Sequence, residues 1–361
     1  MTPHLYAIPV IVRISHFANQ IHARRARSVA VTMDTKLVLV DGMPGTGKST
    51  VSQFINMQLR DNGFSSQWHH EEANHPVRQF YVAARHQTWS DYAKEVLALW
   101  QMYVNEMGRL NRISVLDAAL FQTHVRSMLI FDADRNAILE LIHSVASTIA
   151  PLNPRLVYLK PASVEEHFRE VAQIRGQRML GLWVESHDQY PYTLHSSTSG
   201  YSAFLAFWEE YGKITDSIYE SLNISKLRQN ASIESWHARL SQICEFLNLS
   251  NPVGTCSTFD FARFAGEYAL LDDDTSPRFR LQLRDECLVA SVSNPTYDPN
   301  RCPIVRFEQT LLIPIGDYAC ALAGWPHVVQ FIENGPGGED HVQAIIHEED
   351  SSESGDVYLK C

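Results

Sequence analysis

A short apolar run that leads directly into a glycine-rich loop constrains the fold of this chain more than any other feature. Residues 37–40 read LVLV, and residues 41–50 read DGMPGTGKST. A continuous apolar run of this length is typical of a strand that is buried on both faces of a parallel sheet. Apolar side chains then recur at helical spacing from Val51 to Leu59, before an Asn-Gly pair. The sequence therefore predicts a strand, a loop and a helix in direct succession.

The loop fits the pattern G-x-x-x-x-G-K-S/T, the Walker A motif, over residues 42–49. Its glycines allow backbone N–H groups to converge on phosphate oxygens, and the following helix adds its positive N-terminal end. Lys48 suits the β- and γ-phosphates, and the Ser49 hydroxyl suits Mg²⁺, so we expect ATP and Mg²⁺ as cofactors. A chance glycine turn is the alternative. The residues expected to contact the nucleotide are Gly42, Met43, Pro44, Gly45, Thr46, Gly47, Lys48, Ser49 and Thr50.

Strand and helix patterns alternate from the loop to about residue 250. Further strands are predicted at 66–69, 112–116, 154–159 and 224–227. Helical patterns are predicted within 92–107, 138–149, 163–221 and 233–247. This alternation predicts an α/β domain of three layers over residues 34–250, in which helices cover both faces of a parallel sheet. Ligands bind such sheets at the carboxyl ends of the strands.

Acidic residues follow two of these predicted strands. Asp117 comes directly after the strand at 112–116, where it can join the loop serine as a metal ligand or orient a second substrate; a helix N-cap is the alternative. Glu71 and Glu72 follow the strand at 66–69, where one of them can take the proton from an attacking hydroxyl; solvent-exposed charge beside a turn is the alternative. We expect these carboxylates and the loop to converge on one edge of the sheet.

Two arginines lie three residues apart in the stretch REVAQIRGQR, at the predicted end of a helix. Arginines that close over a nucleotide stabilise the charge on a moving phosphoryl group, which is the role expected of Arg175 and Arg178. Gly176 between them permits a hinge. A solvated helix face is the alternative.

Other patterns are typical of packing rather than of a site. The aromatic residues between Phe204 and Tyr211 recur at helical spacing, which favours core packing over a substrate box. The histidines between positions 69 and 75 match no ordinary zinc spacing. The six cysteines form no C-x-x-C pair, so we expect reduced thiols in a cytoplasmic protein.

The overall composition is that of a globular protein, with 45% hydrophobic and 20% charged residues. The net charge of −11 argues against broad nucleic-acid binding, which requires a basic face. No apolar run reaches the roughly 18–20 residues that span a bilayer. We therefore expect neither a nucleic-acid nor a membrane partner, and the sequence leaves the oligomeric state open.

Residues 1–33 contain four arginines and no acidic residue. An organellar transit peptide has this character, and a start codon assigned too early, with Met33 as the real start, is the other interpretation. We favour the second interpretation and leave this N-terminal extension outside the predicted fold.

The alternation of strand and helix patterns ends at about residue 250, where NPVGTCST suits a linker. Short strand patterns separated by turn signals predict a small antiparallel β domain over residues 258–347. The stretch EEDSSESGD predicts an acidic, disordered tail within 348–361. The strands of the β domain are predicted at 278–283, 287–293, 304–307, 310–313, 327–332 and 342–346.

Residues 35–250 resemble the nucleoside and nucleotide kinase-like group of P-loop proteins, which includes thymidylate kinases and deoxynucleoside kinases. GMPGTGKST carries most of the resemblance, and HHEEANHP, VLDAALFQ and FREVAQIRGQR are similar to the group's strand-two carboxylate, strand-three acid and arginine-bearing lid. The resemblance implies a glutamate of the EE pair as the base, Asp117 as the acid, and the two lid arginines as phosphate contacts. The arginine that often follows the acid is replaced here by Ala118 and Ala119.

The last hundred residues are similar to the small lipocalin-like β domain that is appended to some β-lactamase-related proteins. FAGEY and LLIPIGDYACALAGWPHVVQF carry this resemblance, which implies an accessory or binding module.

From these features we expect an ATP-dependent phosphotransferase that moves the γ-phosphoryl group to the hydroxyl of a small-molecule acceptor. No N-K-x-D guanine motif occurs, and no apolar run ending in two acids follows the loop at the usual distance, which disfavours GTPases and AAA or transporter ATPases. The alternative is a switch protein that binds and hydrolyses ATP and engages a partner through the β domain. The expected catalytic residues are Lys48, Glu71, Glu72, Asp117, Arg175 and Arg178.

Overall fold

The computed structural model describes most of the predicted α/β domain and the strands that follow it. The described residues are 33–71, 75–77, 88–196, 198–231, 236–249, 261–270, 279–284, 287–292, 310–316, 319–322, 327–333, 342–348 and 356–360. Residues 1–32 of the N-terminal extension and the predicted strand at 304–307 lie outside these ranges.

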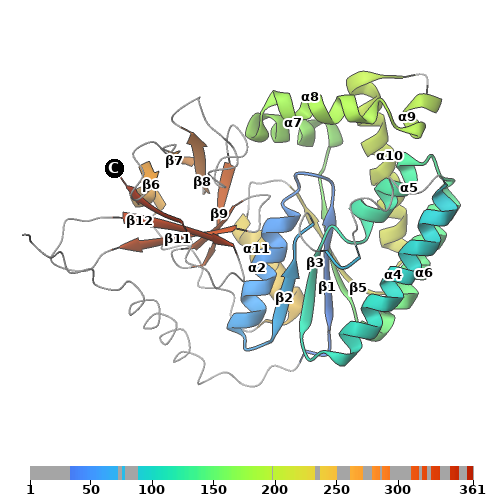
Figure 1. The fold of residues 1–361 in the computed structure, drawn as a ribbon, viewed down its shortest axis with the longest axis horizontal. Helices are drawn as coiled ribbons and strands as arrows, with labels where there is room; N and C mark the ends of the chain where they lie inside the picture. Colours follow the sequence, from blue (N-terminus) through green and yellow to red (C-terminus); the bar gives the residue numbers. More distant parts are fainter. Residues whose placement is uncertain are drawn as a thin grey trace, which may run out of the picture.

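Strands and helices alternate through the first part of the chain, as the sequence predicts (Figure 1). The strands are β1 (Leu37–Gly42), β2 (Ser66–His69), β3 (Ile113–Asp117), β4 (Arg155–Lys160) and β5 (Ser225–Asn230). The helices are α2 (Lys48–Asp61), α4 (Trp89–Arg109), α5 (Arg126–Ile130), α6 (Arg135–Ile149), α7 (Val164–Arg175), α8 (Gln177–His187), α9 (Pro191–His195), α10 (Gly200–Ser221) and α11 (Trp236–Leu247). A π-helical turn, Phe121–Val125, precedes α5.

The five described strands of this part form one parallel sheet in the order β2-β3-β1-β4-β5. The central strand β1 is buried along its whole length, because helices cover both faces of the sheet. Leu37 and Leu39 face the layer of α4, α6 and α10, whereas Val38 and Val40 face α2 and α11. The predicted three-layer α/β class is therefore confirmed, and the carboxyl end of β1 leads into the glycine-rich loop.

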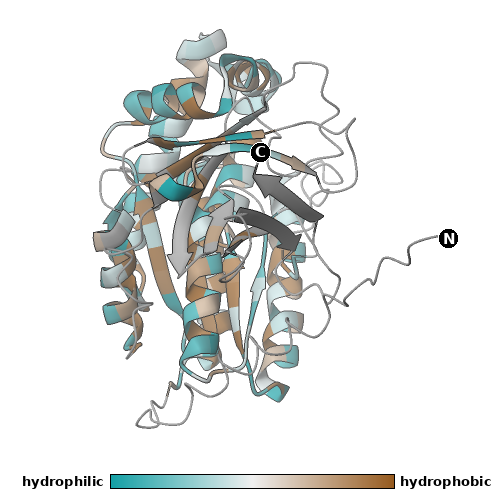
Figure 2. Ribbon diagram, turned by 90° about the vertical axis from the view of Figure 1, so that its left-hand side faces the viewer, coloured by the Kyte–Doolittle hydropathy of each residue, from teal (hydrophilic) through white to brown (hydrophobic). Residues whose placement is uncertain are grey.

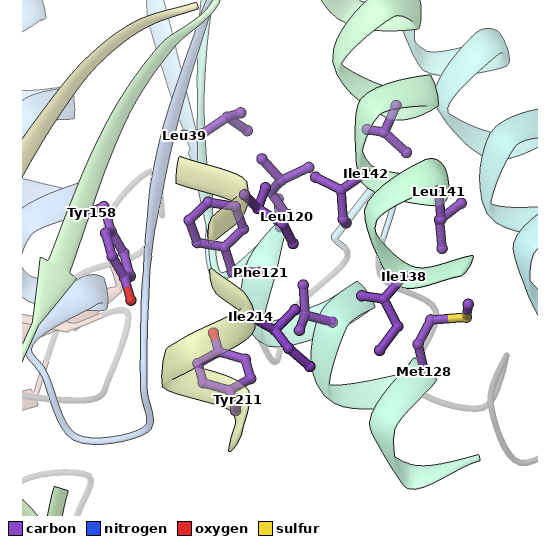
Figure 3. Close-up of a cluster of buried hydrophobic side chains, with 14 of the residues drawn as sticks. Leu39, Leu120, Phe121, Met128, Ile138, Leu141, Ile142, Tyr158, Tyr211 and Ile214 are labelled. Atoms are coloured by element: carbon purple, nitrogen blue, oxygen red, sulfur yellow. The ribbon is translucent and has the colours of Figure 1, made fainter. Parts of the chain in front are cut away.

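The larger apolar layer lies on the side of α4, α6 and α10. Leu39, Phe121, Tyr158 and Ile214 meet there between the sheet and the helices (Figure 3). Hydrophobic and hydrophilic bands run along the outer helices, as the amphipathic patterns require (Figure 2). This layer holds α4, α6 and α10 against one face of the sheet.

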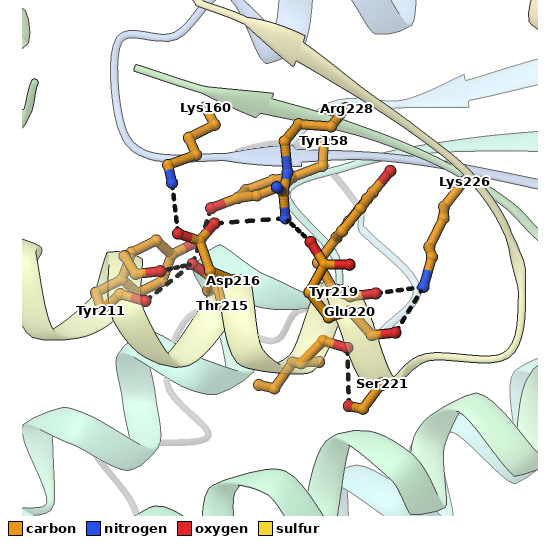
Figure 4. A network of polar contacts seen from close by, with 12 residues as sticks. Tyr158, Lys160, Tyr211, Thr215, Asp216, Tyr219, Glu220, Ser221, Lys226 and Arg228 are labelled. Carbon is orange, nitrogen blue, oxygen red and sulfur yellow. Dashed lines mark hydrogen bonds and ion pairs between the residues drawn. The ribbon is translucent and has the colours of Figure 1, made fainter. Parts of the chain in front are cut away.

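A polar network joins α10 to the edge strand β5 (Figure 4). Asp216 of α10 contacts both Lys160 of β4 and Arg228 of β5, and Glu220 also pairs with Arg228. The Arg228 guanidinium lies 4.2 Å from the ring centroid of Tyr219. These contacts hold the edge of the sheet against α10 and place cations along the open strand, which disfavours pairing with a further strand.

The C-terminal part forms a closed antiparallel barrel from the described strands, in the order β10-β11-β12-β13-β6-β7-β8-β9. These strands are β6 (Gly266–Leu270), β7 (Phe279–Arg284), β8 (Cys287–Val292), β9 (Thr310–Gly316), β10 (Ala319–Leu322), β11 (His327–Glu333), β12 (Val342–Glu348) and β13 (Asp356–Lys360). The predicted β domain is confirmed. Residues 349–355 of the predicted acidic tail lie outside the described residues, but the chain beyond them does not belong to a disordered tail, because β13 pairs with both β12 and β6 and closes the barrel. The likeness to a lipocalin-like module stays a prediction.

Stacked aromatic side chains fill part of the barrel interior. Phe264 stacks on Phe331 with ring centroids 4.3 Å apart, and Tyr268 stacks on Phe279. All four side chains are buried. On the outside, β10 packs against α2 and β9 packs against α7.

Candidate functional site

The glycine-rich loop turns sharply between β1 and α2 and is enclosed by helices on two sides. Gly45 has φ +84°, a conformation that residues with a side chain rarely adopt. A Cβ atom at Gly45 would lie 2.5 Å from Cγ2 of Val171 on α7, and one at Gly47 would lie 2.6 Å from the Trp236 ring on α11. A Cβ atom at Gly42 would also lie 2.4 Å from the backbone oxygen of Leu159, so close contacts exclude a side chain at all three glycines of the motif.

The start of α2 offers backbone N–H groups that can donate to a phosphate. Gly47 is the N-cap residue and no side chain caps the first N–H groups of the helix. The Lys48 side chain is buried and its Nζ donates to Met43 O at 2.9 Å, so the ammonium lies over the loop. Thr46 Oγ1 donates to the same carbonyl at 2.9 Å. Ser49 is buried in the first turn of α2. This set of amide, ammonium and hydroxyl groups fits a triphosphate with Mg²⁺.

Asp117 ends β3 and is fully buried at the edge of the sheet that carries the loop. It lies opposite Val40 in the parallel pairing of β3 with β1. The pairing of the two strands therefore places Asp117 beside the end of β1, close to the start of the loop, as the sequence predicts. Ala118 follows with φ +57°, a strained conformation for alanine, and turns the chain back into the π-helical segment.

Glu71 follows β2 and contacts the segment that follows β3. Nε2 of Gln122 donates to Oε2 of Glu71 at 2.9 Å, so this carboxylate is oriented toward the neighbouring strand end. Glu72, the other candidate base, lies outside the described residues. Gln122 was not among the predicted site residues, because a glutamine directly after the apolar stretch at 118–121 has no distinguishing pattern.

A buried carboxylate next to the loop was also absent from the predicted site. Asp41, the last residue before Gly42, is fully buried, and its two oxygens accept from the backbone N–H groups of Leu120, Phe121 and Gln122 at 2.7–2.8 Å. Burial raises the pKa of Asp41, whereas these N–H donors and the charge of Lys48 oppose that rise. The aspartate thus binds the start of the π-helical turn to the strand that carries the loop.

Two aromatic side chains hold the other side of the π-helical turn through His124. Trp100 Nε1 donates to His124 Nε2 at 2.9 Å, because an indole N–H is only a donor. The proton of the neutral ring then lies on Nδ1, which is 3.0 Å from the Tyr92 hydroxyl. This buried network fixes the turn that places Gln122.

Helix α7 packs directly on the loop. Nε2 of His167 donates to Pro44 O at 2.8 Å. Burial lowers the pKa of His167 to about 4, and the nearby charges of Lys48 and Arg175 act in the same direction. His167 is therefore neutral at pH 7. Because the charges of both Lys48 and Arg175 act on the His167 ring, Arg175 lies in the neighbourhood of the loop.

The two predicted lid arginines lie on different helices. Gly176, with φ +93° and ψ 146°, separates α7 from α8, so the expected break is present between them. Arg175 ends α7 and is partly buried, whereas Arg178 lies in the first turn of α8 and is exposed.

The aromatic residues of α10 form core, as the sequence favours. Phe204, Phe207, Trp208 and Tyr211 are all buried beneath α7 and α8. Tyr211 also lies beside the loop, with its hydroxyl 3.5 Å from Gly42 O, and burial together with Asp41 raises its pKa. Among the described residues, no group of three potential metal-ligating side chains occurs around the histidines at 69–75.

Comparisons with known proteins give distant structural similarities. No family model matches the chain and no curated protein matches it by sequence. The structure of deoxyadenosine kinase from M. mycoides with bound dATP is 15% identical, with a TM-score of 0.36, over 60% of this chain and 100% of that one. Thymidylate kinase from Candida albicans is 12% identical, with a TM-score of 0.36, over 61% and 96% of the two chains. The protein APE1195 is 12% identical, with a TM-score of 0.29, over 52% and 98%.

The helices were also compared with the requirements of a membrane span. Over the described ranges, none of the helices combines the length and the apolar character that crossing a membrane requires.

Proposed function

We propose that this chain is an ATP-dependent phosphotransferase, a small-molecule kinase that moves the γ-phosphoryl group of Mg-ATP to a hydroxyl acceptor. One observation carries the proposal: Glu71 comes after β2 and Asp117 ends β3 at the same edge of the sheet where the loop with Lys48 and Ser49 follows β1. A phosphate-binding loop beside a carboxylate that can accept a proton suits transfer to a hydroxyl.

The loop side of the site binds the nucleotide in this proposal. ATP with Mg²⁺ supplies the transferable group when bound. The N–H groups at the start of α2 and the Lys48 ammonium hold the phosphates, and Ser49 with Asp117 holds the metal. Arg175 offsets negative charge from α7, and Arg178 is the second candidate for that role.

The acceptor side of the site handles the proton. Glu71 takes the proton of the acceptor hydroxyl, with its carboxylate oriented by Gln122. Glu72 remains the other candidate for the base. The enclosure of the loop by α7 and α11 favours exclusion of water, so that the phosphoryl group passes to the acceptor instead.

Incubation of the protein with γ-labelled ATP, Mg²⁺ and a library of hydroxyl-bearing metabolites tests the proposal. We expect label in an organic product, a loss on the order of 10²-fold or more in Lys48→Ala, and loss of transfer with retained MgATP binding in Glu71→Gln. Lys94→Ala, which removes an exposed lysine of α4, is the control and should match the parent. Label that appears only as inorganic phosphate, whatever the acceptor, would contradict a kinase and favour a hydrolytic switch.

A further inference from the structure

The carboxylate of Asp41 is shared by four backbone N–H groups from two parts of the chain. Oδ1 accepts from Gly42 at 3.1 Å and from Gln122 at 2.8 Å, while Oδ2 accepts from Leu120 at 2.7 Å and from Phe121 at 2.8 Å. The donors beyond β1 lie about 80 residues further along the sequence, so this contact is tertiary. A carboxylate with several charge-assisted hydrogen bonds is a strong and directional tie.

The two parts that Asp41 joins are the two halves of the proposed site. Gly42 begins the phosphate-binding loop, and Gln122 contacts the candidate base Glu71 through its side chain. A continuous path of hydrogen bonds therefore runs from the loop through Asp41 and the backbone of Gln122 to Glu71 Oε2. No other carboxylate is needed to relate the position of the base to that of the loop.

An aspartate suits this place in a way that its isostere does not. The four N–H groups require an acceptor at both side-chain oxygens, and asparagine offers only one oxygen. In Asp41→Asn, an NH₂ group would face two of the N–H donors and leave them without an acceptor in a buried setting. The turn would then shift away from β1 and carry Gln122 with it.

We propose that Asp41 and Gln122 are positioning residues that set the placement of Glu71 relative to the phosphate-binding loop. Neither touches the phosphates or takes the proton; Asp41 fixes the backbone of Gln122, and the Gln122 amide orients the Glu71 carboxylate. This inference rests on the proposed phosphotransferase function, because it assigns the pair an effect on transfer.

Steady-state kinetics with γ-labelled ATP and the acceptor found in the library test the pair. We expect kcat to fall about 10- to 100-fold in Gln122→Met and in Asp41→Asn, because a displaced group costs rate even when binding is kept. The KM for ATP should change less than about threefold in Gln122→Met, which leaves Asp41 and the loop unaltered. Asp216→Asn removes a partly buried carboxylate from the α10–β5 network and should leave both constants at the parent values.

The background of Glu71→Gln separates positioning from a general loss of structure. If the pair acts through Glu71, Gln122→Met should add little to the loss already caused by Glu71→Gln, whereas independent defects would multiply. Equal melting temperatures of Gln122→Met and the parent show that the fold is kept. If Asp41→Asn does not fold, Gln122→Met alone tests whether the pair positions Glu71.

The outcomes separate the two proposals. Transfer by the parent with unchanged kcat in Gln122→Met, or with multiplicative losses in the double variant, overturns the positioning pair and leaves the kinase standing. Absence of transfer by the parent to every acceptor overturns the proposed function and the pair together.

Discussion

Gly45 is the residue on which the contact between the glycine-rich loop and α7 depends. Its positive φ excludes ordinary side chains, and Val171 occupies the place where a Cβ atom would lie. Sequence alone identifies Gly45 as part of a Walker A motif, but it does not indicate that a helix from residues 164–175 closes over it.

Gly45→Ala should destabilise the protein by more than its backbone conformation explains. Gly63 has nearly the same φ, +85°, with nothing within 4 Å of an added Cβ, so Gly63→Ala reports the cost of a left-handed alanine alone, about 1–2 kcal/mol. We expect an additional loss of about 1–3 kcal/mol in Gly45→Ala from overpacking against Val171. Denaturant unfolding measures both. The additional loss should shrink in the double variant with Val171→Ala, and its persistence there would show that α7 does not restrict this position.

His167 gives the stability of the protein a dependence on pH. Its pKa in the folded chain, about 4, lies below the ordinary value of 6.5, so the unfolded chain binds more protons between these limits. The stabilising effect is therefore complete above about pH 6.5 and is lost as the pH falls toward 4, by about 3 kcal/mol at most.

His167→Gln keeps a donor for Pro44 O but cannot titrate, so its free energy of unfolding should fall less between pH 6.5 and pH 4 than that of the parent. His187, whose pKa burial also lowers to about 4, contributes a similar slope that the variant retains. Identical pH profiles of parent and variant would show that His167 is not held neutral.

The candidate site was predicted in part from single residues. The loop, Asp117, Glu71 and Arg175 could be proposed from the sequence because motifs and strand ends mark them. Asp41 was missed because an aspartate before a glycine is typical of any turn, and its four hydrogen bonds appear only when residues 120–122 fold back onto β1. Gln122 and His167 were missed for the same reason, since their partners are distant in sequence.

The strands and helices were predicted well where apolar patterns are long and less well where they are short. The strands of the parallel sheet lie within one to three residues of their expected bounds, and the largest difference is at the end of the edge strand β5. A buried central strand is easier to predict, because it reads as a continuous apolar run. In contrast, β6, β10 and β13 were not predicted as separate strands. β6 and β10 have only five and four residues, and β13 follows an acidic stretch whose composition predicts disorder. Pairing within a closed barrel forms all three strands.

The junction between α7 and α8 should depend on a glycine. Gly176 has φ +93° and ψ 146°, a region that is almost exclusive to glycine, so Gly176→Ala should destabilise the protein by about 1–3 kcal/mol. Gly181 lies inside α8 with open space around it, and Gly181→Ala should stabilise by about 0.5–1 kcal/mol. Thermal unfolding of the two variants should therefore shift in opposite directions; a shift of the same sign would contradict the assigned conformation at one of them.

At the scale of the whole molecule, the barrel touches the two helices that border the loop. Strand β10 packs against α2, which begins at Lys48, and β9 packs against α7, which carries His167. A ligand bound to the loop would therefore contact or adjoin the same two helices that the barrel contacts.

MgATP at 100 times its dissociation constant should stabilise the folded chain by about 2.7 kcal/mol. Because of the contacts with α2 and α7, we expect hydrogen exchange to slow not only in residues 37–61 but also in β9 and β10. The nucleotide should produce neither change in Lys48→Ala. Slower exchange confined to the α/β part would show that the barrel is energetically independent of the loop.

The seam of the barrel lies between β6 and β13, the first and last of its strands along the chain. A ribosome must therefore deliver nearly the whole of this segment before the seam can form, whereas every strand of the parallel sheet has emerged by residue 230. Since N-terminal domains fold first during synthesis, the nascent α/β part can serve as a finished surface on which the late-closing barrel assembles.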